Sequence, residues 1–323
     1  MASPVGRRGA IMRQRRRRRR LRLARTVGVA VALSLAGFYA VSRVTAPHFG
    51  PSRGSIQRLK KAPVATTGTT EVKHAASVTK DLFSVPSIAS YLAASPYNVT
   101  AAVYDDVTGT TSVFRPGDAE ACASIMKVDI LATLLGEAQA QGVVSLPADQ
   151  QVLAQQMIEE SNDDDAQDLW DFEGGATAVG HFDGQVGLTQ TTPDTAGYWG
   201  LSTTTAADQV QLLRDVAYPN GVLTDASRTY ELSLMTNVDP SQTWGISAGV
   251  ESGATVAIKD GWVTLDNESP PWQVNSIGYV NGDGRNYVIA VLTTGEDTEQ
   301  EGIQTIQGLS SLIWAQLAPT TRA

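Results

Sequence analysis

The basic residues of this sequence are concentrated at one end of the chain. Residues 1–61 hold 16 of the 25 Lys and Arg residues and no Asp or Glu, so the rest of the chain carries all 33 acidic residues. The two regions therefore need separate explanations. The strongly acidic remainder should repel nucleic acid and anionic lipid, which argues against a nucleic-acid enzyme and against any nucleic-acid partner.

The uncharged segment that follows the basic run predicts a membrane span. Residues 26–42 contain no charged residue, and a helix of this length spans roughly 26 Å, enough for a thin hydrocarbon core if Arg43 snorkels. The arginine excess before it predicts a cytoplasmic amino terminus. We therefore expect a basic cytoplasmic tail over residues 1–25, an anchor over residues 26–46 and a single-pass protein of the cell membrane. The alternative is a signal peptide cleaved after residues 34–36, which would give a secreted protein.

The rest of the chain predicts a linker and one domain. Residues 47–82 mix Pro, Gly, Thr and Lys without sustained periodicity, which is typical of a flexible linker. Residues 83–319 show no internal repeat and have the size of a single large domain.

Hydrophobic periodicity and turn residues predict the order of elements in that domain. Helices are expected over residues 84–95, 124–140, 146–160, 164–172, 176–187, 205–216, 224–238 and 299–317. Strands are expected over residues 97–104, 110–115, 255–258, 273–280 and 287–294. This order predicts an α+β domain, in which one antiparallel sheet built from both ends of the chain is flanked by the N- and C-terminal helices and an all-helical subdomain lies beside it.

The cysteine and histidine content limits the chemistry. Cys122 is the single cysteine of the sequence, so no intrachain disulfide can form. The three histidines, His48, His74 and His181, share no metal-ligand spacing. We therefore expect no metal, no cofactor and no Ser-His-Asp triad.

The most apolar of the expected helices opens with Ser124 and Lys127. Residues three apart share a helical face, so the hydroxyl and the amine can meet. A partly desolvated lysine can serve as the base for a serine nucleophile, and the helix dipole at Ser124 favours developing negative charge. The pattern is weak by itself, because Ser77 and Lys80 match it too. The alternative is a helix cap beside a snorkelling lysine.

Two later motifs strengthen the catalytic interpretation. Ser161-Asn162-Asp163 lies in a break between helices, and Lys259-Asp260-Gly261 lies where a strand is expected. With Ser124-Ile125-Met126-Lys127 before them, they resemble the S-x-x-K, S-D-N and K-[TS]-G motifs of the serine β-lactamase and penicillin-binding D-alanyl-D-alanine peptidase superfamily, class A β-lactamases in particular. The resemblance covers about residues 83–319 and implies the fold of that superfamily.

The resemblance also implies a role for each matching residue. Ser124 would be the acylated nucleophile, and Lys127 would be its activating base. Ser161 would pass a proton to the leaving nitrogen, and Lys259 would supply positive potential beside it. The backbone N–H groups of Ser124 and Trp262 would form the oxyanion hole.

Two departures from the family motifs concern substrate binding, where Asp163, Asp260 and Gly261 are the expected contacts. Asp163 replaces an Asn, and a carboxylate can accept from Lys127 and raise its pKa but cannot donate to a substrate carbonyl unless protonated. Asp260 replaces a Thr or Ser that contacts the substrate carboxylate in the family, so its charge would repel such a substrate.

A third departure concerns release of the acyl group. Residues 190–202 contain no Glu, the residue that activates the deacylating water in class A β-lactamases, and Asp194 is the only acidic candidate. The aromatic residues expected to line the cleft are Tyr198, Trp199 and Trp262.

These observations together predict an extracytoplasmic serine hydrolase that forms an acyl-enzyme on Ser124. Its substrate would be a small molecule or a peptide, including β-lactams and cell-wall peptide amides, with efficient β-lactam hydrolysis less expected than turnover of another amide, ester or peptide. One alternative is a catalytically weak module of the same fold that binds a cell-wall peptide. Another is a structural ectodomain of a membrane complex.

Overall fold

A computed structural model describes residues 81–266 and 269–317. The expected tail, the expected anchor, residues 47–80 of the expected linker and the Ser77/Lys80 pair lie outside the described residues. Within the described ranges, no helix is long and apolar enough to cross a membrane.

One antiparallel sheet, formed by five strands of the described residues, is the centre of the fold, and its strand order is β2-β1-β7-β6-β5. The strands are β1 (Asn98–Asp105), β2 (Thr110–Phe114), β5 (Thr255–Asp266), β6 (Ser269–Gly282) and β7 (Arg285–Glu296). The N-terminal hairpin joins the three C-terminal strands through β1 and β7, where Ala101 pairs with Val291. Both ends of the chain therefore build one sheet, which confirms the expected α+β architecture.

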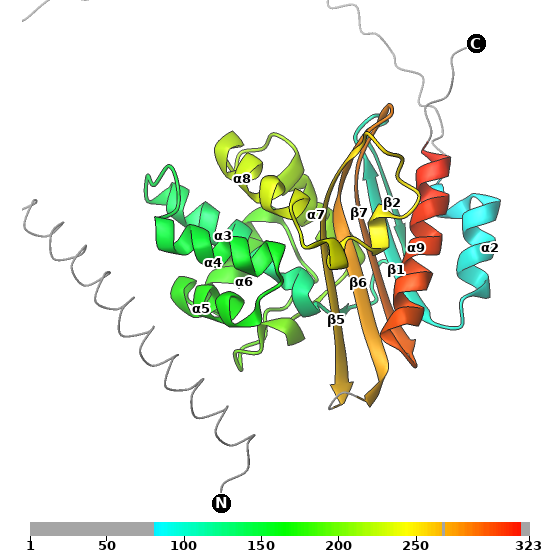
Figure 1. The fold of residues 1–323 in the computed structure, drawn as a ribbon, viewed down its shortest axis with the longest axis horizontal. Coiled ribbons are helices and arrows are strands. Elements are labelled where there is room, and N and C mark those ends of the chain that lie inside the picture. Colours follow the sequence, from blue (N-terminus) through cyan, green and yellow to red (C-terminus); the bar gives the residue numbers. More distant parts are fainter. Residues whose placement is uncertain (1–80, 267–268, 318–323) are drawn as a thin grey trace, which may run out of the picture. The chain divides into compact units, whose positions relative to one another are not determined.

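Helices cover both faces of this sheet (Figure 1). On one face pack α2 (Pro86–Ala94) and α9 (Glu299–Gln316), and on the other lies the helical subdomain. Strand β7 shows how one sequence serves both faces, because its side chains alternate in direction. Val288, Ala290 and Leu292 pack into the core shared with the helical subdomain, whereas Ile289 and Val291 pack into the core under α2 and α9.

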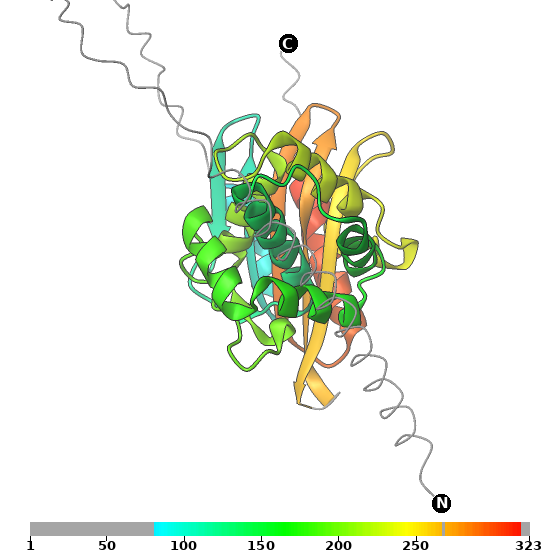
Figure 2. The ribbon, with the colours of Figure 1, turned by 90° about the vertical axis from the view of Figure 1, so that its left-hand side faces the viewer.

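The helical subdomain lies in front of the sheet when viewed along the direction of Figure 2. Its helices are α3 (Met126–Ala140), α4 (Ala148–Glu159), α5 (Asp163–Glu173), α6 (Ala176–Val186), α7 (Ala206–Ala217) and α8 (Asp225–Thr236). Every residue of α3 from Met126 to Leu135 is buried. Helix α3 is thus the central helix of the subdomain, as its apolar sequence predicts.

Three local features differ from the sequence prediction. Strand β5 runs to residue 266 instead of ending at 258, because pairing with β6 carries it through residues of low strand propensity such as Asp260 and Gly261. Ser124 lies in a 3-10 turn, η2 (Ala123–Ile125), and α3 begins only at Met126. The two-residue strands β3 (Glu120–Ala121) and β4 (Thr203–Thr204) pair with each other, and segments so short carry no periodic signal.

Candidate active site

Ser124 and Lys127 meet at the start of α3. Lys127 lies in the first turn of that helix with 0% of its surface exposed, and its Nζ is 2.9 Å from Ser124 Oγ. Ala123 has a φ of 48°, in the left-handed region that few non-glycine residues adopt. This backbone conformation forms the turn that carries Ser124, and it is typical of functional sites.

Ser161 links the helical subdomain to the sheet. It lies between α4 and α5, also with a positive φ, of 53°. Its Oγ is 2.9 Å from Lys127 Nζ and 3.0 Å from Lys259 Nζ, and its backbone carbonyl accepts from Lys127 Nζ at 2.7 Å. The four residues expected to be catalytic therefore form one chain of contacts, from Ser124 through Lys127 and Ser161 to Lys259.

Lys259 projects from β5 and is only 1% exposed. Besides Ser161, its Nζ donates to the backbone carbonyl of Asp260 at 3.1 Å and to Gln242 Oε1 at 3.5 Å. Burial, helped by the charge of Lys127, lowers the pKa of Lys259 to about 7. This amine can therefore gain or lose a proton near neutral pH.

Two opposing effects act on Lys127. Burial lowers its pKa, whereas the Asp163 carboxylate, with Oδ1 2.7 Å from Nζ, raises it. Burial outweighs the carboxylate, so the net shift is downward. The indole ring of Trp199 lies 4.9 Å from the same Nζ. Lys127 is therefore closer to a neutral base at physiological pH than an exposed lysine would be.

Gly261 lets β5 approach the turn that holds Ser124. A Cβ at position 261 would lie 2.7 Å from the backbone N of Ser124 and 2.8 Å from that of Ile125, closer than real Cβ contacts. From the neighbouring strand, Asn275 Nδ2 donates to the carbonyls of Ala121 and Cys122 at 2.9 and 3.0 Å. No motif or periodicity in the sequence singles out Asn275, because only the β5–β6 register, in which Asn275 pairs with Gly261, brings it beside this segment.

Asp260 lies on β5 beside Lys259, but its side chain does not face the pocket where the family resemblance implied a substrate contact. It is fully buried, and its Oδ1 accepts from Ser276 Oγ at 2.6 Å. Burial raises its pKa well above the usual range, which favours the neutral acid. Asp260 is not among the described residues that line the pocket beside Ser124, so the repulsion expected from its charge finds no support in this geometry.

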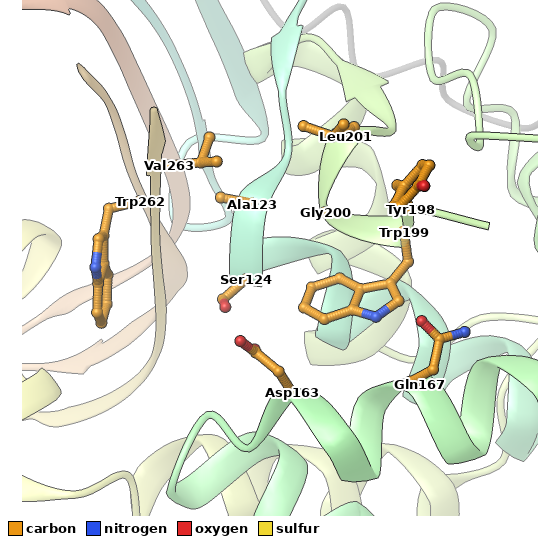
Figure 3. A pocket seen from close by; sticks show the side chains of 10 residues that line it. All are labelled: Ala123, Ser124, Asp163, Gln167, Tyr198, Trp199, Gly200, Leu201, Trp262 and Val263. Carbon is orange, nitrogen blue, oxygen red and sulfur yellow. The ribbon is translucent and has the colours of Figure 1, made fainter. Parts of the chain in front are cut away.

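A pocket of about 300 Å³ opens beside Ser124 (Figure 3). It is lined by Ala123, Ser124, Asp163, Gln167, Tyr198, Trp199, Gly200, Leu201, Trp262 and Val263. In Figure 3, Trp262 lies on one side of Ser124 and Trp199 on the other, and the Asp163 carboxylate points toward Ser124. The three aromatic residues expected along the cleft all line this pocket.

The loop over residues 190–202 closes one side of the site without presenting an acid to it. Asp194 Oδ1 accepts from the backbone N of Ala196 and of Tyr198, both at 2.9 Å, so this carboxylate caps its own loop. The loop is tied to the turn of Ser124, since Cys122 N donates to the carbonyl of Ser202 at 2.7 Å. Among residues 81–266 and 269–317, no group of His, Cys, Asp or Glu could hold a metal ion.

The fold and this arrangement of two serines and two lysines define a protein of the serine β-lactamase-like superfamily. The chain belongs to the β-lactamase enzyme family, whose model matches residues 148–317, slightly more than half of the chain. Ser124 and Lys127 precede the matched region, and the structure brings them to the motifs that lie within it.

Similar solved structures agree on the fold. PBP-A has 20% sequence identity and a TM-score of 0.61, over 70% of this chain and 92% of that one. The TLA-1 extended-spectrum β-lactamase has 18% identity and a TM-score of 0.63, over 72% of this chain and 96% of that one. A class A β-lactamase from Mycobacterium abscessus has 19% identity and a TM-score of 0.60, over 71% and 96%.

Curated relatives include "Putative lipoprotein LppW" of Mycobacterium tuberculosis and of Mycobacterium bovis. Each is 26% identical to this chain over 205 residues, which is 62% of this chain. The chain spans about 64% of the length of these relatives.

Proposed function

We propose that this protein is an extracytoplasmic serine hydrolase that forms an acyl-enzyme on Ser124. The observation that carries the proposal is the unbroken chain of contacts from Ser124 Oγ through Lys127 Nζ and Ser161 Oγ to Lys259 Nζ. This chain lies beside a pocket large enough for a small molecule or the end of a peptide. Family membership supports a hydrolytic reaction of this kind.

Acylation would follow from these contacts in three steps. Neutral Lys127 takes the proton of Ser124 Oγ as that oxygen bonds to the substrate carbonyl carbon. The backbone N–H groups of Ser124 and Trp262 stabilise the negative charge on the carbonyl oxygen. As the bond to the leaving nitrogen or oxygen breaks, Ser161 gives that atom its hydroxyl proton and is reprotonated by Lys127.

Positive potential from Lys259 would support the proton transfer through Ser161. Its Nζ lies 3.0 Å from Ser161 Oγ, and an ammonium there stabilises negative charge on that oxygen during the transfer. The low pKa of Lys259, about 7, makes this support stronger below neutral pH.

Release of the acyl group should be slow for a β-lactam. Asp194, the only acid of residues 190–202, has an Oδ1 that accepts two N–H groups of its own loop and does not line the pocket. A β-lactam would therefore label the protein more readily than it would be hydrolysed. We propose that the natural substrate is another amide, ester or peptide, with cell-wall peptides as one source.

We also propose that the folded domain lies outside the cytoplasm, attached to the membrane by residues 26–46. The lipoprotein name of the LppW relatives supports a membrane-attached protein. Protease treatment of intact cells tests the orientation, because an external domain is digested while the amino-terminal tail is protected. A mature chain starting near Gly37 would replace this proposal with signal-peptide cleavage.

Intact-mass measurement tests the acyl-enzyme directly. The protein is exposed in turn to a penicillin, a cephalosporin and an activated ester, and Ser124→Ala serves as the control. We expect the mass of one acyl group on the native chain with at least one probe, and none on the variant. Absence of any adduct, or equal labelling of Ser124→Ala, would contradict the proposal.

A second candidate is a module of the same fold that binds a cell-wall peptide without turning it over. The orientation of Asp194 favours it, because the loop supplies no acid for deacylation among the pocket residues. Saturable binding of a cell-wall peptide that leaves the protein mass unchanged would support this second function.

A further inference from the structure

The charged groups that face the pocket are unusual for a site that would bind a carboxylate. Among the described lining residues, none is Lys or Arg, and the one charged side chain is Asp163. That side chain is 76% exposed, and its carboxylate points toward Ser124 (Figure 3). A ligand beside Ser124 therefore meets this carboxylate first, and the charge of Asp163 is uncompensated when Lys127, 2.7 Å away, is the neutral base.

The two lysines behind the pocket have no N–H group left for a ligand. An ammonium has three N–H donors, and a neutral amine has two. Lys127 Nζ already faces four acceptors: Ser124 Oγ, both oxygens of Ser161, and Asp163 Oδ1. Lys259 Nζ faces three, on Ser161, Gln242 and Asp260. A substrate carboxylate would lose its hydration in the pocket and gain no charged hydrogen bond in return.

The net negative charge of residues 81–317 also opposes the binding of an anionic ligand. Residues 81–317 contain six Lys and Arg residues against 32 Asp and Glu residues. The four arginines among them pack over an aromatic ring or beside a carboxylate outside the pocket: Arg115 over Phe114, Arg214 over Tyr104, Arg228 beside Asp225 and Arg285 over Trp314. This domain therefore attracts cations and repels anions at long range.

The walls of the pocket fit a positively charged or neutral aromatic ligand. Tyr198, Trp199 and Trp262 line it, and aromatic faces attract ammonium groups as well as other rings. We infer that the pocket beside Ser124 selects acyl donors that are aromatic or apolar and carry a positive charge or none, and that it rejects donors bearing a carboxylate. This inference rests on the proposed acyl transfer and narrows its substrate class. Penicillins, cephalosporins and peptides that end in a free carboxylate would then acylate Ser124 more slowly than a neutral or cationic ester of equal intrinsic reactivity.

Three matched esters test the inference on the full-length protein. Each is a phenyl ester of 3-phenylpropanoic acid, with hydrogen, trimethylammonium or carboxylate at the para position of the acyl-side ring. Rates of Ser124 acylation are divided by the rate of each ester with water, a neutral nucleophile, which removes differences in intrinsic reactivity without adding a charge preference. We expect the cationic ester to react roughly tenfold faster than the anionic ester at low salt, with the ratio falling toward one in high salt. An anionic ester that reacts as fast as the cationic one overturns the inference.

A change at the pocket margin tests whether the selection arises in this pocket. Gln167 lines the pocket and its amide donates to Asp171 Oδ1 at 3.0 Å. Gln167→Lys should lower the cation-to-anion rate ratio at least threefold, whereas Gln167→Met, of similar length and neutral, should leave the ratio unchanged. Equal ratios in both variants would overturn the assignment to this pocket.

A binding measurement separates this inference from the proposed function. The Ser124→Ala variant cannot be acylated, so the amides that correspond to the three esters are titrated against it by tryptophan fluorescence. If no ester labels the native protein but the cationic amide binds more tightly than the anionic one, the proposed function fails, and the inferred charge selection by the pocket stands as a property of binding. If labelling occurs and the anionic amide binds as tightly, the function stands and the inference fails.

Discussion

Lys127 is the residue on which the proposed chemistry depends most. It is buried, it contacts both site serines, and a carboxylate lies 2.7 Å from its Nζ. An exposed lysine would stay protonated and could not accept the proton of Ser124. Burial lowers the pKa of Lys127, and Asp163 limits how far it falls. The pair therefore sets the pH at which the base becomes available.

Replacing the base should remove most of the acylation rate. We expect Lys127→Ala to slow acylation of Ser124 by roughly 10²–10⁴-fold, the usual contribution of a positioned base. Stopped-flow labelling with an activated ester measures the rate, and near-UV circular dichroism checks that the variant is folded. A folded Lys127→Ala protein that is labelled at the native rate would exclude Lys127 as the base.

Changing Asp163 should move the pH dependence of acylation. Acylation needs neutral Lys127, so the rising limb of its pH profile should follow the pKa of that lysine, while loss of the Lys259 proton above about pH 7 opposes the rise. Asp163→Asn removes the charge that raises this pKa, so the rising limb should move to lower pH. Glu251→Gln makes the same change in net charge at an exposed position outside the pocket and should leave the limb in place. A limb that does not move in Asp163→Asn would contradict the electrostatic role of Asp163.

At the scale of elements, the site is the meeting of three segments. The turn η2 carries Ser124, the break between α4 and α5 carries Ser161, and β5 carries Lys259. Gly261 sets how closely β5 approaches η2, since any side chain there would press on the backbone of Ser124 and Ile125. The close approach of β5 to η2 therefore depends on the absence of a side chain at position 261.

Adding a methyl group at position 261 should push β5 away from the turn η2 that carries Ser124. We expect Gly261→Ala to slow acylation by about 10²-fold, because a displacement approaching 1 Å is enough to spoil attack geometry, and to destabilise the domain by about 1–3 kcal/mol. Gly117→Ala is the matched control, since a Cβ there meets nothing within 4 Å. Acylation kinetics and thermal unfolding of both variants measure the effect. Equal behaviour of the two variants would show that β5 and η2 are not in close contact.

At the scale of the whole molecule, the helical subdomain buries several carboxyl groups away from the pocket. Asp129 and Glu231 are completely buried, and Asp183 is only 3% exposed. Burial raises the pKa of all three, and that of Asp183 reaches about 7. The charge of Asp183 raises the pKa of Asp129 further, whereas the interaction with Asp129 lowers that of Asp183. The folded state therefore holds protons that the unfolded chain would release.

This proton uptake predicts the direction in which stability depends on pH. The folded-state pKa values are raised, so the stabilising effect of these groups is complete below the unfolded values near 4 and is lost as pH rises through the folded values. From Asp183 alone, whose folded-state pKa is about 7, we expect the free energy of unfolding to fall by about 2–4 kcal/mol between pH 5 and pH 8. Urea unfolding at the two pH values measures it.

Removing one of the buried acids should flatten this dependence. Asp129→Asn keeps the shape of the side chain without a titrating group, so we expect it to be more stable than the native chain at pH 8. Glu251→Gln again provides the control at an exposed position. Native stability that rises with pH, or an Asp129→Asn variant less stable at pH 8 than the native chain, would contradict the account.

The sequence by itself determined the order of helices and strands, the central place of α3 and the three motifs. These features depend on local periodicity, on turn residues and on spacing within one helix, as for Ser124 and Lys127. Tertiary structure decided what these local patterns leave open. The pairing of β5 with β6 turned Asp260 toward Ser276 and brought Asn275 to Ala121, and the folding of its own loop turned Asp194 away from the pocket. Neighbours far away in the sequence set the direction of a side chain on a paired strand and the burial that shifts its pKa. Local sequence patterns therefore cannot predict either property.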